Sequence, residues 1–414
     1  MKKIHKILQI FRSFLKKKHR NVFLIMLHEY WHSLDKQNAQ IQKSPYQIES
    51  LQFESSNHKK FLLVTHEFSR TGAPYAVLYL ARALFSISGV KPIVLSAKDG
   101  MIRKEFEEEG FVTVIDPLLF HHNEYSSGVI DFVASFEMVI VTSLGSFDFI
   151  RNFRGINHRL IWWLHETEVG FNTIQNMRVN LSVLFGACEA IWLGSPLCLP
   201  LASQYTSQKK LHLLLYGCAD QSMPHRSHLF GKLIFSIIGS IEQRKGQDIF
   251  LNAINQLPHA LRKRAVFRII GSALPNWDSE IFCKKIYADA SLIPEVECIP
   301  SVPVDKLLEY YAESNVIVSA SRDDPMPIAI TQGLMFSKLC ICSSGIGHAL
   351  LLEHMKDGLI FSNKSSKELA DMIVWAIQNP SKLENIGLAG RLCYEQNFLM
   401  SDFVRNVNNL TQIS

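Results

Sequence analysis

From residue 59 onward, short apolar runs rich in Val, Ile and Leu alternate with longer runs of mixed polar and apolar residues. Such short runs predict buried parallel strands, and the segments between them predict helices, which is the pattern of a doubly wound α/β sheet. The predicted strands are 61–64, 91–96, 111–115, 138–142, 159–165 and 191–195, then 233–238, 266–271, 296–300, 316–320 and 339–342. The pattern therefore predicts two α/β domains, at 59–230 and 231–400, with 191–195 as the last strand of the first.

The two ends of the chain depart from this alternation. Residues 2–18 predict an amphipathic helix, because apolar side chains fall on one helical face and cations fill much of the rest. Residues 35–58 are rich in Gln, Asn and Ser and are typical of a linker, so that 1–58 form an extension. From residue 371 the chain is expected to be helical, with a last helix within 401–414.

The positive charge is concentrated in the extension. The net charge is +5, yet residues 1–20 hold eight Lys and Arg side chains and no acid, and the rest of the chain is slightly acidic. This balance argues against a nucleic-acid-binding body. A basic amphipathic helix can lie on an anionic membrane surface, and it can equally dock on the protein itself or on a partner.

Cysteine and histidine patterns add two observations. The eight cysteines are scattered without a CxxC pair, and several lie in apolar runs, which is typical of reduced core residues in a cytoplasmic protein. His28 and His32 belong to an HExxH pattern, which matches a zinc-peptidase signature. No further ligand pattern accompanies it, and we favour the alternative, a polar and aromatic helix surface.

The stretch 321–347 carries the first candidate for binding chemistry. A predicted strand ends in a turn from Asp323 to Pro327, and the turn opens a predicted helix at 328–335. The first amides of a helix have no partners within it and its dipole favours negative charge, so such an entrance can bind phosphate. Asp324 is out of place beside phosphate alone. A hydroxyl-bearing group next to the phosphate would explain the acid, and that combination is a nucleotide sugar.

Two more strand ends carry polar groups. The turn 239–247 holds Arg244 and Lys245, and two cations at a strand-to-helix turn suit a diphosphate leaving group. A solvated basic turn is the alternative. His165 and Glu166 stand at the end of the predicted strand 159–165, where open α/β sheets bind ligands. For His165 the alternative is a satisfied core imidazole.

These stretches resemble retaining glycosyltransferases of family four, which have the GT-B fold. The family carries two glutamates separated by seven residues in its donor-binding segment, and Asp324 and Gln332 stand at that spacing here. The segment THEFSRTGAP, with Gly72 and Ala73, is similar to the family's N-terminal glycine loop. The segment WWLHETEVG, with His165, is similar to its His-Glu segment.

The sequence also departs from the family pattern. In the turn that contains SIEQRKGQ the family has a basic residue after its first glycine and a lysine before its second; Ser240 replaces the former and Lys245 keeps the latter. Gln332 exchanges a carboxylate for an amide, which can still accept from a ribose hydroxyl and can also donate. With the long extension, these departures support an alternative function, a non-catalytic GT-B subunit that binds and stabilises a partner transferase.

The resemblance implies two Rossmann-like domains facing a central cleft, with the last helix crossing back to the first domain. It implies that a sugar moves with retention from a UDP- or GDP-sugar to a glycan or lipid-linked glycan, without a metal or other cofactor. The implied setting is bacterial surface polysaccharide biosynthesis at the inner face of the cell membrane.

The resemblance also implies roles for individual residues. Asp324 would face the donor sugar, Gln332 the ribose, and the segment 296–300 the nucleobase. The implied catalytic residues are Lys245, Asp324 and His165. The implied donor-binding residues are Gly72, Ala73, Ser240, Arg244, Lys245, Ile299, Asp324, Met326, Pro327, Ile328 and Gln332.

Overall fold

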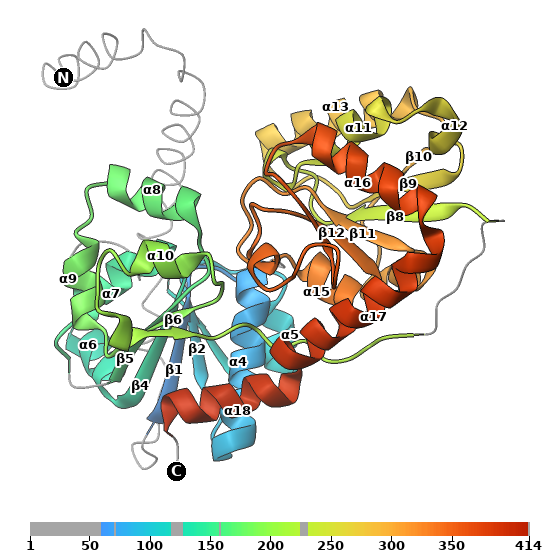
Figure 1. Ribbon diagram of the computed structural model, residues 1–414. Coiled ribbons are helices and arrows are strands. Elements are labelled where there is room, and N and C mark those ends of the chain that lie inside the picture. Colours follow the sequence, from blue (N-terminus) through green and yellow to red (C-terminus); the bar gives the residue numbers. More distant parts are fainter. Residues whose placement is uncertain (1–58, 70–71, 117–126, 157–158, 224–230, 413–414) are drawn as a thin grey trace, which may run out of the picture. The chain divides into compact units, whose positions relative to one another are not determined.

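The computed structural model describes residues 59–69, 72–116, 127–156, 159–223 and 231–412. The predicted basic helix, the linker and the pattern at His28 and His32 lie outside these residues. Within them, helices and strands alternate through two sheets, as the apolar pattern predicts (Figure 1). The described residues belong to one compact unit.

The first sheet has seven parallel strands in the order β3-β2-β1-β4-β5-β6-β7. Its strands are β1 (Lys59–Thr65), β2 (Ile93–Ser96), β3 (Val112–Ile115), β4 (Phe136–Thr142), β5 (Arg159–Leu164), β6 (Ala190–Leu193) and β7 (Leu211–Leu213). Its helices are α4 (Gly72–Ser88), α5 (Arg103–Glu108), α6 (Ser127–Ala134), η1 (Leu144–Ser146), α7 (Phe147–Phe153), α8 (Glu168–Asn176), α9 (Leu181–Ala187), α10 (Cys198–Ala202) and η2 (Gln208–Lys210).

The second sheet has six parallel strands in the order β10-β9-β8-β11-β12-β13. Its strands are β8 (Leu233–Ile238), β9 (Ala265–Ile270), β10 (Val296–Ile299), β11 (Val316–Ser319), β12 (Leu339–Ser343) and β13 (Leu359–Phe361). Its helices are η3 (Gln243–Lys245), α11 (Gln247–Gln256), α12 (His259–Arg262), α13 (Trp277–Ser291), α14 (Val304–Glu313), α15 (Ile328–Met335), η4 (Gly347–Leu350), α16 (Ser366–Gln378) and α17 (Pro380–Asn397).

Both sheets have the strand order of a doubly wound domain. The chain moves outward in one direction from β1 and in the other from β4, and it does the same from β8 and β11. Each sheet therefore has one switch point between two central strands, and ligands of such sheets bind at the carboxyl ends of those strands. This arrangement confirms the predicted fold class of two doubly wound α/β domains.

The sequence prediction missed one edge strand in each sheet. The strand predicted at 191–195 is not the last of the first sheet, because β7 follows it and pairs with β6. In the second sheet β13 pairs with β12 and was not predicted. Each of these edge strands has three residues, and a run of that length is too short to carry a periodic pattern.

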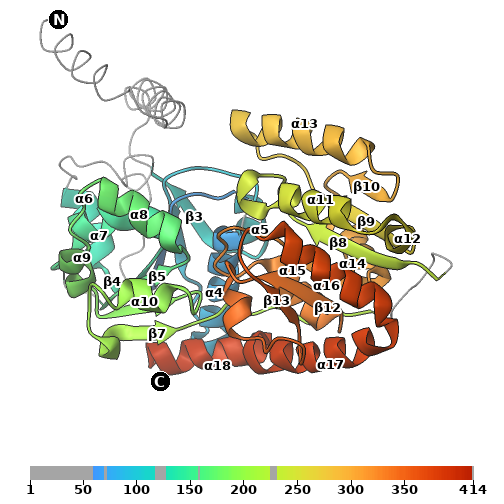
Figure 2. The same cartoon turned by 45° about the horizontal axis from the view of Figure 1, so that its top comes forward.

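The last helix, α18 (Met400–Thr411), packs against the first domain. Figures 1 and 2 show α18 following α17, and α18 contacts α4 while α17 contacts α15. The buried Phe403 of α18 stacks on Trp163 of β5, with ring centroids 6.1 Å apart. Arg159 donates to the carbonyl oxygen of Thr411 over 2.7 Å. Aromatic packing of this kind fixes the helix to the first sheet.

Gly246 tests the backbone contact at the second switch point, and Gly89, which follows α4, is the comparison. Gly246 has a φ of 73°, and a Cβ there would lie 2.0 Å from the carbonyl oxygen of Ala320, which follows β11. Gly89 has a φ of 70° with no atom within 4 Å of such a Cβ. Gly89→Ala should therefore lose only the cost of left-handed backbone, about 1 kcal/mol. Gly246→Ala must also displace the end of β11 and should lose about 3 kcal/mol or more.

Urea unfolding of the two variants measures this difference through midpoints at unchanged slope. Equal losses in Gly89→Ala and Gly246→Ala would contradict the close contact between Gly246 and Ala320.

Candidate functional site

The switch point of the second sheet brings two predicted site segments together. Strands β8 and β11 are neighbours, with Ile237 opposite Val318. The chain leaves β8 through the turn that holds Arg244 and Lys245, and it leaves β11 through the turn that holds Asp324. Because the strands are parallel, both turns lie at the same edge of the sheet, although about eighty residues separate them in sequence.

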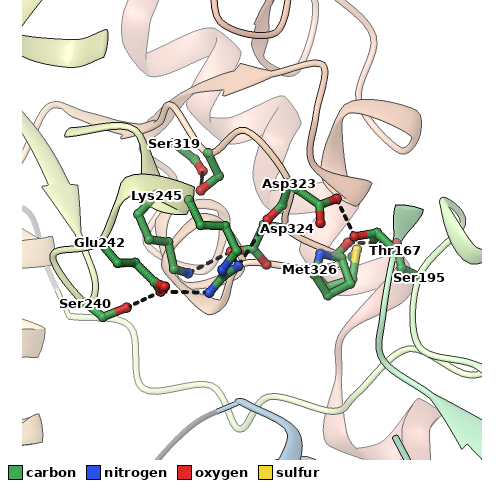
Figure 3. A network of polar contacts seen from close by, with 12 residues as sticks. Thr167, Ser195, Ser240, Glu242, Lys245, Ser319, Asp323, Asp324 and Met326 are labelled. Atoms are coloured by element: carbon green, nitrogen blue, oxygen red, sulfur yellow. Dashed lines mark hydrogen bonds and ion pairs between the residues drawn. The ribbon is translucent and has the colours of Figure 1, made fainter. Parts of the chain in front are cut away.

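The two cations converge on one carboxylate oxygen. Lys245 Nζ donates to Asp324 Oδ2 over 2.7 Å, and Arg244 Nη1 donates to the same oxygen over 3.1 Å. Figure 3 shows Lys245 and Asp324 pointing toward each other. The Asp324 side chain is only 7% exposed, and burial alone would raise its pKa; the charges of Lys245 and Arg244 outweigh burial and hold the pKa below its usual value.

A second carboxylate, Glu242, holds Arg244 from the other side. Arg244 Nη2 donates to Glu242 Oε1 over 2.9 Å, and Ser240 Oγ donates to that same oxygen over 2.8 Å. Burial lowers the pKa of Arg244, but Asp324 and Glu242 outweigh burial and raise it. Arg244 is therefore a fixed cation between two acids, and its side chain remains 40% exposed.

Backbone contacts hold the Asp324 turn in place. The amide of Asp324 donates to the carbonyl oxygen of Gly345, and the amide of Gly347 donates to the carbonyl oxygens of Asp324 and Pro325. A Cβ at Gly347 would lie 2.0 Å from the carbonyl oxygen of Pro325, so only glycine allows this approach. The turn then opens α15, with Pro327 at its N-cap.

Hydroxyl groups from the first domain also reach this turn. Thr167 Oγ1 donates to a carboxylate oxygen of Asp323, and Ser195 Oγ donates to the carbonyl oxygen of Pro325 over 2.7 Å (Figure 3). The hydroxyl of Tyr216 lies 2.6 Å from that of Thr331 on α15. Strand ends of the first sheet therefore contact the segment that holds Asp324.

His165 lies one strand away from the switch point of the first sheet, which falls between β1 and β4. It follows β5, is half-buried, and its Nε2 is enclosed without a hydrogen-bond partner among the described residues. Burial, and then His66 after β1, lower the pKa of His165 to about 3, so its ring is neutral at physiological pH. Ser143 after β4 has a φ of 73° and donates to the carboxylate of Glu166. No hydrogen bond or ion pair of the described residues joins His165 to Asp324.

The remaining predicted donor residues lie around α15 or farther away. Gly72 begins α4 close to α15, since a Cβ on it would lie 3.9 Å from Cδ1 of Ile328. Met326 is buried, and Gln332 is half-buried with no side-chain hydrogen bond to a described residue. Ile299 ends β10, two strands away from β8, where its carbonyl oxygen accepts from Gly271.

The three remaining predicted donor residues lie at the beginnings of α4 and α15. Ala73 lies half-buried in the first turn of α4, and Ile328 is the first residue of α15. Pro327 is buried at the N-cap of α15.

In the part of the chain that the structure describes, no three His, Cys, Asp or Glu side chains are arranged to hold a metal ion. None of the described helices is long and apolar enough to cross a membrane.

Sequence reasoning missed several polar residues of this region. Glu242 stands inside the motif SIEQRKGQ, and the sequence analysis assigns it no role. Thr167 and Ser195 follow β5 and β6, and their position at strand ends was the one available signal. His348 is fully buried, and its Nε2 lies 2.8 Å from Thr331 Oγ1. No spacing in the sequence indicated this contact.

Comparison with known proteins places the chain in a class. The family model of glycosyl transferases group 1 matches residues 224–392, and the model of glycosyl-transferase family 4 matches residues 57–190. Together the two models span most of the described residues, and the chain belongs to the glycosyltransferases that they define. No curated protein matches the chain.

Solved structures confirm the GT-B fold. The Anabaena protein Alr3699/HepE in complex with UDP has 15% sequence identity and a TM-score of 0.73, over 86% of this chain and 100% of that chain. Its complex with UDP-glucose gives 15% and 0.71 over the same shares. Sucrose-phosphate synthase from Thermosynechococcus elongatus has 14% identity and a TM-score of 0.68, over 85% of this chain and 98% of that chain.

His348 provides a test of the buried polar network. Burial lowers its pKa from 6.5 to about 3, so the unfolded chain binds a proton in this interval that the folded chain does not. Above pH 6.5 the neutral imidazole costs the folded chain no stability. As the pH drops from 6.5 toward 3, the free energy of unfolding falls by up to about 1.4 kcal/mol per pH unit for this histidine. His348→Gln keeps a polar side chain opposite Thr331 and should lose stability less steeply.

Urea unfolding between about pH 7 and pH 5 measures this slope. The exposed His259→Gln is the matched control and should follow the wild type. A slope for His348→Gln that equals that of the wild type would contradict a buried neutral imidazole.

Proposed function

We propose that this protein transfers a sugar from a nucleoside-diphosphate sugar with retention of anomeric configuration. The observation that carries the proposal is the meeting of Lys245, Arg244 and Asp324 at the switch point of the second sheet. Cations suit a diphosphate, and a carboxylate suits the hydroxyls of the sugar beside it. The donor would be a UDP- or GDP-sugar, and the Anabaena complexes with UDP and UDP-glucose favour UDP.

The proposed chemistry depends on the leaving group. As the bond to the sugar breaks, negative charge grows on the diphosphate and positive charge grows on the sugar. Lys245 and Arg244 would stabilise the leaving diphosphate, and the amides of Ile328 and Ala329, which open α15, would add hydrogen bonds. Asp324 would accept from sugar hydroxyls. These groups would supply the stabilisation without a metal or other cofactor.

The other predicted residues have supporting roles in this proposal. Gln332 lies on α15 and would contact the ribose, while Ile299 would lie near the nucleobase. His165 is neutral, so it would act as a hydrogen-bond partner of the sugar and not as a charged acid. Gly72 and Ala73 begin α4, with Gly72 close to Ile328 of α15, and they would lie beside the donor phosphates. The acceptor would be a glycan or lipid-linked glycan of bacterial surface polysaccharide biosynthesis.

A non-catalytic subunit that stabilises a partner transferase is the second candidate. The substitutions at Ser240 and Gln332 favour it, because each removes a charge that the family carries. Turnover of any nucleotide sugar by the protein alone would exclude it.

Lys245→Ala tests the proposed leaving-group role. Loss of one preorganised charge partner should lower donor hydrolysis or transfer by roughly 10²–10³-fold, about 3–4 kcal/mol of transition-state stabilisation. Turnover of UDP- and GDP-sugars by the wild type and the variant measures the effect. The control is Lys306→Ala on α14, whose lysine is exposed and paired with Glu309. Unchanged turnover in Lys245→Ala would remove this residue from the mechanism.

We further propose that residues 1–20 bind the inner face of the cell membrane, near the acceptor. Each basic residue near an anionic surface contributes about 1 kcal/mol, and salt screens the attraction. The chain without residues 1–20 should keep its affinity for UDP or GDP but lose salt-sensitive binding to anionic vesicles. Co-sedimentation with anionic and with neutral vesicles measures this loss. Equal sedimentation of both chains would show that this segment contacts protein instead.

A further inference from the structure

The two cations at the second switch point already have carboxylate partners. Lys245 Nζ and Arg244 Nη1 both donate to Asp324 Oδ2, and Arg244 Nη2 donates to Glu242. Two positive and two negative charges therefore cancel at this site. The sequence alone suggested two cations available to a diphosphate, and the geometry shows that they are not free.

A diphosphate that binds here meets a charge conflict. Its oxygens would share the cations Lys245 and Arg244 with Asp324 Oδ2, and they would lie within a few ångströms of a like charge. Like charges at such separations in a buried site repel strongly. Protonation of Asp324 does not resolve the conflict near neutral pH, because Lys245 and Arg244 favour its charged form. Replacement of the carboxylate by the diphosphate on these cations would remove the conflict.

We propose that Asp324 changes partners during donor binding: the diphosphate replaces it on Lys245 and Arg244, and the released carboxylate accepts from hydroxyls of the donor sugar. This inference rests on the proposed function and deepens it. Asp324 then links diphosphate binding to sugar binding, because its Oδ2 becomes available to the sugar only when the diphosphate holds the cations. A sugar without its diphosphate would find Oδ2 of Asp324 occupied.

The backbone geometry confines this exchange to a side chain. The amide of Asp324 is bonded to Gly345, and its carbonyl oxygen accepts from Gly347. On one side Thr167 holds the Asp323 carboxylate, and on the other Ser195 holds the carbonyl oxygen of Pro325. With the chain fixed before and after it, Asp324 can change partners by rotation about its side-chain bonds alone. Glu242 keeps its bond to Arg244 throughout, so one cation stays in position.

Nucleotide affinity of Asp324→Asn tests the exchange. The amide removes the charged competitor at nearly the same shape, so UDP or GDP should bind about tenfold more tightly than to the wild type. UDP-glucose should gain less, because it loses the carboxylate that accepts from its sugar. Titration calorimetry of the full chain with UDP, GDP and UDP-glucose measures both changes.

Asp323→Asn is the matched control. It removes the same charge one residue away, where the side chain bonds to Thr167 and to neither cation, so its affinity for UDP or GDP should change by less than about threefold. An equal gain in UDP or GDP affinity in both variants would show that the loss of one negative charge explains the effect, and it would overturn the exchange. Weaker UDP and GDP binding by Asp324→Asn would show that Asp324 positions the two cations for the diphosphate, and it would also overturn the exchange.

A wild-type structure with UDP or GDP bound decides the question even if the variants fail to fold. The exchange requires that Asp324 Oδ2 lies beyond hydrogen-bond distance of Lys245 Nζ while the diphosphate is in place. Persistence of both ion pairs beside the bound diphosphate overturns the exchange and leaves the proposed function standing. A wild-type chain that binds neither UDP nor GDP overturns the proposed function, and the exchange with it.

Discussion

The ion pairs from Lys245 and Arg244 to Asp324 are the interaction on which the second domain's site depends. They join the turn after β8 to the turn after β11, and both turns exist in this form because glycine removes a side chain where two backbones meet. Gly246 lies against the carbonyl oxygen of Ala320, and Gly347 lies against that of Pro325. Burying Asp324 costs free energy that a single partner would recover poorly. Two cations on one oxygen, with Glu242 behind Arg244, make the buried charge tolerable.

Contacts between the two domains differ in kind at two places. At the site, neutral hydroxyls of Thr167, Ser195 and Tyr216 reach the segment from Asp323 to Thr331, and each such bond contributes on the order of 1 kcal/mol. Where the chain crosses back, aromatic packing dominates, with Phe403 of α18 stacked on Trp163. The apolar contact is the larger and the less directional of the two.

Much of the fold could be predicted from apolar periodicity. Strand β8 and helix α15 have the predicted bounds, and most other central strands differ by one or two residues at their ends. The outer strands β7 and β13 could not be predicted, because a strand of three residues is stabilised by its neighbour and not by its own pattern. The edge strands β3 and β10 have four residues each and were predicted, so the local signal fails with strand length and not with position in the sheet.

The residues of the candidate site could be predicted from the sequence, but the ion pairs between them could not. Strand ends and the family resemblance identified Arg244, Lys245 and Asp324, because each stands at the carboxyl end of a predicted strand. That Asp324 binds both cations depends on β8 lying beside β11, which no sequence spacing states. The same holds for Thr167 and Asp323, which are 156 residues apart. Such pairs follow from topology, and topology is set by the whole chain.

Ser240 stands where the family has a basic residue, and the geometry around it weakens the argument that this replacement removes a needed cation. The resemblance places a basic residue at this position, and its loss counted against a working diphosphate site. Ser240 and Arg244 bind the same oxygen of Glu242, and Arg244 reaches Asp324 beside Lys245. Two cations therefore remain at the turn, with one supplied from position 244 in place of 240. The turn thus keeps two charges that the proposed chemistry would use, and the remaining support for a non-catalytic subunit is Gln332 and the extension at 1–58. Gln332 lies on α15, and its side chain has no hydrogen bond to a described residue. An amide can still accept from a ribose hydroxyl, so the exchange of Glu for Gln alone would not disable the proposed donor site.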